Sequence, residues 1–386
     1  MNNFNFYNPV KILFGKGKIA ELGRNIPQNA RILMTYGGGS IYKNGVYEQV
    51  KEALKNFTVV EFGGIEPNPR YETLMKAVEV VKAEKIDFLL AVGGGSVLDG
   101  TKFIAAASLY EGEFAWDIVT KQIVVSKALP IGAVLTLAAT GSEMNSGGVV
   151  TREATQEKFA FSSPELFPRF SVLDPQVTYS LPPRQVANGI VDAYVHVMEQ
   201  YLTYPVNSPV QDRFAEGILL TLIEEGLKAV KAETPDYENR ANLMWAATMA
   251  LNGIIGVGVK SDWSTHMIGH ELTAFHGLDH AVTLAIVLPG VLRLMKDKRR
   301  EKLLQYAQRV WNINQGTDEE RIEAAIQHTE SFFRQVGIAT HLGGHNLGQD
   351  TVDRIVDRFT QRKMRAVGAQ QDVSVANVGE LLGWRL

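Results

Sequence analysis

The 386-residue chain is predicted to form two domains, an α/β domain with a parallel sheet at residues 1–182 and an all-helical domain at residues 183–386. The first half alternates apolar runs with helix-like stretches, whereas the second half contains almost no strand pattern. Continuous apolar strands are typical of parallel sheets, since helices cover both faces. Pro182-Pro183 separates the halves, because consecutive prolines continue neither a helix nor a central strand.

The first half contains four apolar runs that predict buried strands. The first run leads into Gly37-Gly38-Gly39-Ser40, and the third leads into Gly93-Gly94-Gly95-Ser96. Helical periodicity is found at Tyr71–Lys82, and a further helix is expected at about Val97–Leu109. The predicted strands are Arg31–Tyr36, Val59–Phe62, Phe88–Val92 and Pro130–Leu137.

The second half is predicted to be helical throughout, without a long linker, a repeat or a low-complexity tract. The expected helices are Gly189–Tyr204, Phe214–Lys231, Arg240–Ile255, Asp262–Phe275, Val282–Lys296, Glu301–Trp311, Glu319–Val336 and a C-terminal helix from about Val373.

Composition excludes several function classes. A net charge of −3 gives no reason to expect nucleic acid or an anionic membrane as a partner. The absence of cysteine excludes disulfides, thiolate metal ligands and cysteine-ligated iron–sulfur clusters. No signal peptide and no membrane-length apolar run is found, so a cytoplasmic protein with a small-molecule substrate is expected.

The turn Gly93-Gly94-Gly95-Ser96 has the composition of a phosphate-binding turn. Glycine allows close approach of the backbone, and the N-terminus of the following helix offers free N–H groups and a favourable dipole. The alternative is a tight turn that requires positive φ. Asp99, one helical turn further on, either favours the helix N-terminus by its charge or bonds a ribose hydroxyl.

The turn Gly37-Gly38-Gly39-Ser40 bears on the choice of cofactor. NAD-specific enzymes often place an acidic residue after this strand, where it binds the ribose 2′-hydroxyl. This turn has no carboxylate and ends in a serine hydroxyl. The sequence therefore favours NADP(H), with Lys43 as a further contributor to a 2′-phosphate site.

Half of the eight histidines lie between residues 266 and 280. His266 and His270 are four residues apart and share a helix face. His276 and His280 have the same spacing, but Gly277 interrupts them, so the helix should end near Phe275 and His280 should open the next one.

Upstream, Asp192 and His196 form another i,i+4 pair with mostly apolar neighbours. One carboxylate with two or three imidazoles suits Zn²⁺ or Fe²⁺. A metal role is favoured for His266 and His280, although periodicity alone does not decide which clustered histidines bind. A metal beside a nucleotide cofactor indicates redox chemistry at a carbon–oxygen bond.

Several segments, in order along nearly the whole chain, resemble the iron-containing (group III) alcohol dehydrogenases, and most closely their NADP(H)-dependent butanol dehydrogenase and aldehyde reductase branch. The resemblance implies a Rossmann-like first domain, a helical metal-binding second domain (the dehydroquinate synthase-like architecture) and a homodimer. The matching segments are NPVKILFGKG (8–17), GGIEPNPRYETL (63–74), AVGGGSVLDGTKF (91–103), LTLAATGSEMN (135–145) and GHELTAFHGLDHA (269–281).

The resemblance also implies roles for individual residues. The metal ligands would be Asp192, His196, His266 and His280. His270 would lie near the nicotinamide and the substrate, while His276 would lie close to the pocket without being a ligand. The cofactor contacts would include the Gly37–Ser40 turn together with Asn68, Gly94, Gly95, Ser96, Asp99, Thr136, Asn145 and Lys158.

Two motifs depart from the family pattern. The threonine-rich loop lacks one hydroxyl and one glycine, and Leu137 stands where the family has a polar group. The late motif reads Leu278-Asp279-His280-Ala281 instead of the usual Pro-His-Gly. The histidine ligand is kept while its neighbours differ.

The function expected from these motifs is metal-dependent hydride transfer between NADP(H) and short-chain aldehydes or primary alcohols. The metal acts as a Lewis acid on the substrate oxygen. His270 is the expected proton relay or orienting group, and His280 acts through the metal. The alternatives are an NAD(H)-dependent polyol dehydrogenase of glycerol type and a non-catalytic metal- or nucleotide-binding protein. A phosphorylated substrate is disfavoured, since only Lys260 lies near the histidine cluster.

Overall fold

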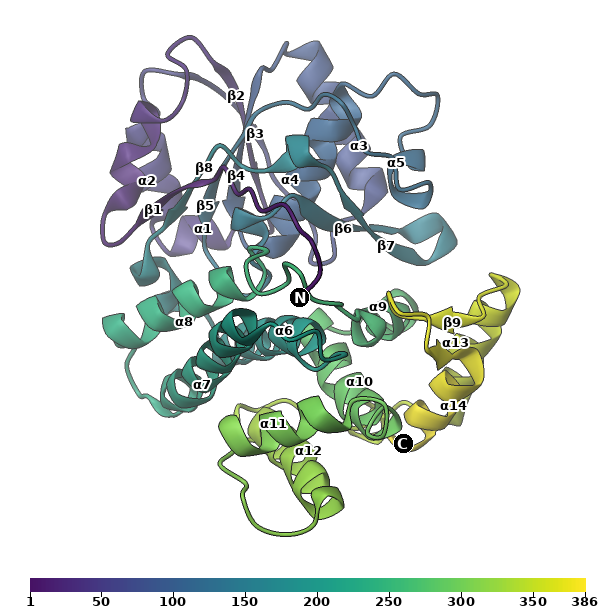
Figure 1. Ribbon diagram of the computed structural model, residues 1–386. Coiled ribbons are helices and arrows are strands. Elements are labelled where there is room, and N and C mark those ends of the chain that lie inside the picture. Colours follow the sequence, from purple (N-terminus) through teal and green to yellow (C-terminus); the bar gives the residue numbers. More distant parts are fainter. The chain divides into compact units, whose positions relative to one another are not determined.

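The structure, a computed structural model, describes residues 1–386 and divides into two compact units. The α/β unit comprises Tyr7–Pro182 and Thr234–Thr248. The helical unit comprises Met1–Phe6, Pro183–Glu233 and Met249–Leu386. Each unit therefore includes a segment from the other half of the chain. Figure 1 shows the elements in sequence colours.

The core of the α/β unit is a six-stranded parallel sheet with the order β1-β8-β5-β4-β2-β3. The four strands predicted from apolar runs all form. The sheet also contains two short strands, β1 at one edge and β8 beside it, of which β8 was not predicted. The strands are β1 (Lys11–Phe14), β2 (Arg31–Tyr36), β3 (Thr58–Phe62), β4 (Phe88–Gly93), β5 (Ile131–Leu135) and β8 (Phe170–Leu173).

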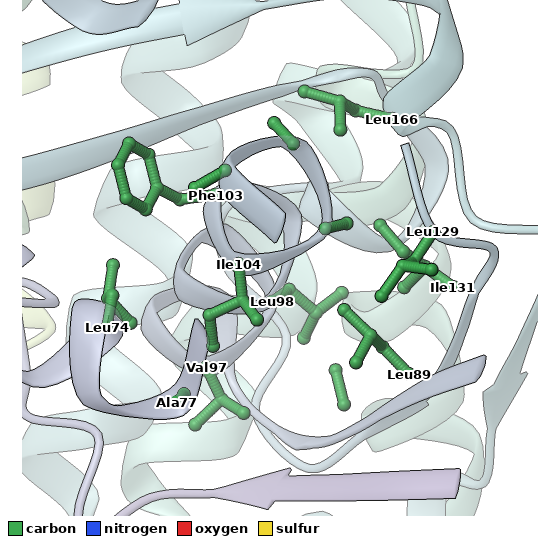
Figure 2. Close-up of a cluster of buried hydrophobic side chains, with 14 of the residues drawn as sticks. Leu74, Ala77, Leu89, Val97, Leu98, Phe103, Ile104, Leu129, Ile131 and Leu166 are labelled. Carbon is green, nitrogen blue, oxygen red and sulfur yellow. The ribbon is translucent and has the colours of Figure 1, made fainter. Parts of the chain in front are cut away.

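Helices cover both faces of this sheet, which confirms the predicted parallel α/β fold. On one face, α3 (Tyr71–Ala83) and α4 (Gly95–Ser108) contribute Leu74, Leu98 and Ile104 to an apolar cluster. Figure 2 shows these side chains in one cluster with Leu89 and Ile131 of the sheet. The opposite face packs against α2 (Val46–Ala53), while α1 (Ser40–Lys43) and α5 (Asp117–Thr120) are single turns.

An antiparallel hairpin, β6 (Gly147–Arg152) and β7 (Glu157–Ser162), packs against α4 and was not predicted. Glycine suits this close contact, because a Cβ on Gly148 would lie only 3.2 Å from the Cα of Asp99. The hairpin thereby lies directly over the first turns of α4.

The helical unit is built around α6, which packs against α7 and α10, and α10 in turn packs against α9. All the predicted helices form, and α13 is an addition. None of the helices combines the length and apolar character that crossing a membrane requires. The elements are α6 (Pro183–Tyr201), α7 (Pro209–Lys231), α8 (Tyr237–Ala250, mostly in the α/β unit), α9 (Ser264–His276), α10 (His280–Leu294), α11 (Arg300–Arg309), α12 (Asp318–Gln335), α13 (Gln349–Gln361), α14 (Val375–Gly383) and the two-residue strands β9 (Ala366–Val367) and β10 (Val373–Ser374).

Candidate metal centre and nucleotide turns

Helix α6 carries the first two expected metal ligands. Its apolar residues pack on both sides, so Asp192 and His196 are only 3% and 4% exposed. Their i,i+4 spacing brings the His196 Nε2 atom to 3.7 Å from the Asp192 Oδ1 atom. Burial lowers the pKa of His196 to about 4, which leaves the imidazole neutral, as a metal ligand must be.

The other two expected ligands lie on α9 and α10, at either side of a sharp chain reversal. Helix α9 ends at His276 because Gly277, with φ +67°, adopts the left-handed conformation of a helix C-cap. Helix α10 then begins at His280, as the glycine interruption predicted. The Nε2 atom of His280 lies 3.7 Å from Asp192 Oδ1, and the ring centre of His266 lies 4.8 Å from that of His196.

Three of these side chains, those of Asp192, His196 and His266, form a group that could hold a divalent cation, and His280 lies beside it. The ligand atoms of Asp192, His196 and His266 all lie within 4.8 Å of one another. Two ligands on one tetrahedral zinc ion are separated by about 3.5 Å, given bonds of about 2.1 Å. The 3.7 Å separations from Asp192 to His196 and to His280 are close to that value. Three nitrogens and one oxygen form a donor set suited to Zn²⁺ or Fe²⁺.

Glu199, one turn after His196 on α6, is a site residue that the sequence reasoning missed. Its carboxylate accepts hydrogen bonds from the backbone N–H groups of Thr265 (2.7 Å) and His266 (3.2 Å). It also pairs with the His266 Nδ1 atom, which leaves Nε2 for a metal. Burial raises the pKa of Glu199 to about 7, while the N–H groups oppose that rise.

The Glu199→Gln variant should bind metal about 10- to 100-fold more weakly, because an amide no longer fixes the His266 tautomer. The measurement is competition between the protein and a chelator of known affinity. Glu271→Gln provides a matched control. Glu271 is buried like Glu199, but it lies on α9 and pairs with Arg358 and Arg362. Equal metal affinity of the Glu199 variant and the wild type would rule out this role.

The remaining residues of the late motif occupy distinct places. The His270 ring is buried and lies 5.4 Å from that of His280, beside the ligand set. The His276 Nε2 atom lies 3.2 Å from the Thr351 hydroxyl of α13. Asp279 accepts a hydrogen bond from Asn188 on α6 and pairs with Arg184, both at 2.7 Å. These contacts link the start of α10 to α6. The resembling family motif usually has proline at the position of Asp279.

The second expected site lies at the carboxyl edge of the sheet. Strands β2 and β4 are hydrogen-bonded neighbours, so the turns that follow them, Gly37–Ser40 and Gly93–Ser96, leave the same edge. In open α/β sheets this edge is where nucleotides bind. Helix α4 begins at Gly95 and directs its N-terminus toward this edge, as a pyrophosphate site requires.

The glycines of the Gly93–Ser96 turn provide space and not a left-handed backbone. Gly94 has φ −87°, and neither Gly93 nor Gly95 has positive φ. A Cβ on Gly95 would lie 2.3 Å from the Thr140 side chain, and one on Gly94 would lie 3.1 Å from that of Leu137. The interpretation of the Gly93–Ser96 turn as one that needs positive φ is therefore wrong. In the Gly37–Ser40 turn, by contrast, Gly39 has φ +93°.

Asn68, Ser96 and Lys158 form one hydrogen-bonded group beside the turn. The Asn68 backbone N–H donates to the Ser96 hydroxyl at 3.2 Å, and Lys158 Nζ donates to the Asn68 side-chain oxygen at 2.7 Å. Thr136 is held next to the turn, since its N–H donates to the Gly93 carbonyl at 3.0 Å. The structure thus brings these expected cofactor contacts together.

Asp99 and Asn145 hold the loop after β5. Asp99 accepts hydrogen bonds from the Ser142 hydroxyl (2.6 Å) and the Val149 N–H (3.0 Å). Asn145 donates to the Gly141 carbonyl at 3.0 Å. Buried Lys102, which the sequence reasoning missed, donates to Ser142, Asn145 and the Gly147 carbonyl at 2.7–2.9 Å. Burial lowers the pKa of Lys102 to about 8, while the charge of Asp99 opposes that shift.

Lys102→Met should lower the free energy of unfolding by about 3–5 kcal/mol, because it removes the buried ammonium that donates to Ser142, Asn145 and the Gly147 carbonyl and whose charge favours the Asp99 carboxylate. Urea denaturation measures the change. The exposed Lys82, replaced by methionine in the same way, should change stability by less than about 0.5 kcal/mol. A Lys102 variant as stable as the Lys82 variant would contradict this account of the loop.

Two family models together match most of the chain. Residues 9–175 match the family model for iron-containing alcohol dehydrogenase, and residues 186–383 match that for the C-terminal part of the family. The chain is 58% identical to the NADPH-dependent aldehyde reductase YqhD of Escherichia coli over 377 residues, 97% of each chain. It is 43% identical to a probable NADH-dependent butanol dehydrogenase of Bacillus subtilis, with 93% of each covered.

Solved structures give the same result. The crystal structure of E. coli YqhD superposes with a TM-score of 0.98 at 56% identity, and covers 100% of this chain and 99% of that one. That of NADH-dependent butanol dehydrogenase A from Thermotoga maritima gives 0.95 at 38% identity, with 100% and 99% covered. The chain therefore belongs to the iron-containing alcohol dehydrogenase family, as the motifs predicted.

Proposed function

We propose that this protein is a metal-dependent NADPH aldehyde reductase that converts short-chain aldehydes into primary alcohols. The observation that carries the proposal is the buried group formed by Asp192, His196 and His266, with the part-exposed His280 placing its Nε2 atom 3.7 Å from Asp192 Oδ1. The activity printed for the 58%-identical E. coli relative supports it. The family gives the coarser conclusion, an oxidoreductase that uses a nucleotide cofactor and a divalent metal.

The chain's own residues supply binding and orientation. When bound, the cation supplies a Lewis acid for the carbonyl oxygen and the nicotinamide supplies the hydride. Glu199 orients the His266 imidazole, and Asp279 holds His280 in place. The product oxygen must also gain a proton. His270, whose buried ring lies beside the ligands, is proposed to deliver that proton or to orient the substrate.

The cofactor is proposed to be NADPH, held at the two glycine turns. The α4 N-terminus and the Gly94, Gly95 and Ser96 turn would bind the pyrophosphate. The Gly37–Ser40 turn has no carboxylate to repel a 2′-phosphate. Asn68, Asp99, Thr136, Asn145 and Lys158 would contact the cofactor directly or hold the loops that do.

Zn²⁺ and Fe²⁺ share this ligand set, so either is proposed as the cation. The protein is also proposed to be a homodimer, on the family resemblance. A cytoplasmic location is proposed because NADPH is the proposed cofactor. Light scattering on the purified protein tests the dimer, which predicts a mass of twice 42.6 kDa.

The activity assay follows NADPH absorbance with butyraldehyde, before and after treatment with a chelator. The proposal predicts NADPH loss that disappears on chelation and returns with Zn²⁺ or Fe²⁺. NADH in place of NADPH, and glycerol with NAD⁺, test the polyol dehydrogenase alternative. No NADPH oxidation with any metal and aldehyde tried would favour a non-catalytic binding protein.

A further inference from the structure

Trp263, the residue before α9, has an unusual backbone conformation. Its φ is +71°, in the left-handed region, where a bulky side chain costs on the order of 1–3 kcal/mol. The other non-glycine residues with positive φ in this protein are all asparagine, lysine or glutamine. A tryptophan kept in such a conformation requires both a structural cause and an explanation of what its ring does.

The structural cause is a rigid frame around the residue. The Asp262 N–H donates to the Glu199 carbonyl at 2.8 Å, and the buried Asp262 carboxylate pairs with Arg299 at 2.9 Å. On the other side, the Thr265 N–H donates to the Glu199 carboxylate at 2.7 Å. Ser264, which is fully buried, also donates its hydroxyl to the Asp262 carboxylate. The backbone is therefore fixed on both sides of Trp263.

This frame places the indole ring against the expected metal ligands. Its centre lies 5.3 Å from that of His266, edge to face at 71°, and 6.4 Å from that of His196. Trp263 is half-buried, whereas both imidazoles are buried. The ring thus covers part of the ligand set and keeps an exposed portion beside it.

Phe275, the other aromatic residue near the histidine cluster, is engaged differently. The guanidinium groups of Arg354 and Arg358 on α13 lie 4.0 and 4.2 Å from its ring centre. Through these cation–π contacts, Phe275 packs α9 against α13. Trp263, in contrast, has its ring contacts with the two imidazoles.

We propose that Trp263 is a specificity-determining residue, whose indole forms one wall of the aldehyde site and limits the bulk next to the carbonyl carbon. The proposal rests on the proposed aldehyde reductase function. Because the frame fixes the backbone that carries the ring, unbranched aldehydes would fit and α-branched or aromatic ones would collide with the indole. A wall of this kind typically discriminates 10-fold or more.

The first test compares kcat/KM for propanal and benzaldehyde in the wild type, Trp263→Ala, Trp263→Phe and Phe275→Ala. The ratio of benzaldehyde to propanal should rise about 10-fold or more in Trp263→Ala and less in Trp263→Phe. Phe275→Ala should keep the wild-type ratio. An unchanged ratio in folded Trp263→Ala, or an equal rise in Phe275→Ala, would overturn the proposal.

The second test does not depend on turnover. Co²⁺ is added to the metal-free wild type and to Trp263→Phe, and tryptophan fluorescence and bound cobalt are both recorded. Quenching that accompanies binding in the wild type and largely disappears in the variant, at equal cobalt stoichiometry, supports the proposal. Equal quenching in both proteins would show that another tryptophan faces the metal and would refute it.

The two tests separate this inference from the function on which it rests. If the wild type reduces no aldehyde with NADPH, the proposed function fails, and the fluorescence result alone decides whether Trp263 faces the metal. If the wild type is active but the variants show no change in either test, only the inference about Trp263 fails.

Discussion

Replacement of His266 by alanine should reduce metal binding to background and lower kcat/KM for butyraldehyde by about 1,000-fold or more. The variant removes one of the three proposed imidazole ligands and leaves the buried Glu199 carboxylate without its partner. Several kcal/mol of Lewis-acid stabilisation would be lost with the cation, and each 1.4 kcal/mol corresponds to a factor of ten. Metal analysis and NADPH absorbance, on the same preparation, measure both effects.

His328→Ala serves as the control, because His328 is an exposed residue of α12 whose ring lies beside Trp311. It should keep both metal and activity. Since His266 is buried, circular dichroism must first establish that its variant is folded. A folded His266→Ala protein that retains metal at full stoichiometry and normal turnover would remove His266 from the ligand set.

Replacement of Gly38 by aspartate should raise KM for NADPH by about 100-fold and change KM for NADH by much less. Gly38 is exposed, its φ is not positive, and a Cβ there would meet no atom within 4 Å, so the turn tolerates a side chain. The new carboxylate would repel a 2′-phosphate, and opposed like charges cost several kcal/mol. Initial rates with each cofactor, at saturating aldehyde, give both constants.

Gly38→Asn separates charge from size, because the amide has nearly the same shape without the charge. It should raise KM for NADPH by less than about 10-fold. If the aspartate and asparagine variants behave alike, the Gly37–Ser40 turn does not recognise a 2′-phosphate, and the choice of cofactor is made elsewhere.

The sequence predicted the buried strands because they are continuous apolar runs, and most helices because their apolar residues keep helical spacing. It missed β8, whose four residues include Ser171, and it missed the β6–β7 hairpin, which carries charged residues such as Arg152 and Glu157. Helix α13 was missed although Val352, Ile355 and Phe359 have helical spacing, because charged residues dominate the segment. Short or mostly polar elements are stabilised by tertiary contacts that a local pattern does not contain.

The expected metal ligands could be found because i,i+4 spacing is a local signal. The residues that support them could not, since their partners are distant in the chain. Glu199 and His266 are 67 positions apart, and Asn188 and Asp279 are 91 apart. Lys102 could have been noticed as a cation one turn after Asp99, but its acceptors are known only once the loop after β5 is placed.

The most direct test of the whole account is an anomalous-scattering measurement on crystals of the protein, with data collected above and below the iron and zinc absorption edges. One strong peak is expected at about 2.0–2.2 Å from an oxygen of Asp192 and from nitrogens of His196, His266 and His280. A protein that reduces aldehydes with NADPH, yet has no peak within bonding distance of these side chains, would contradict it.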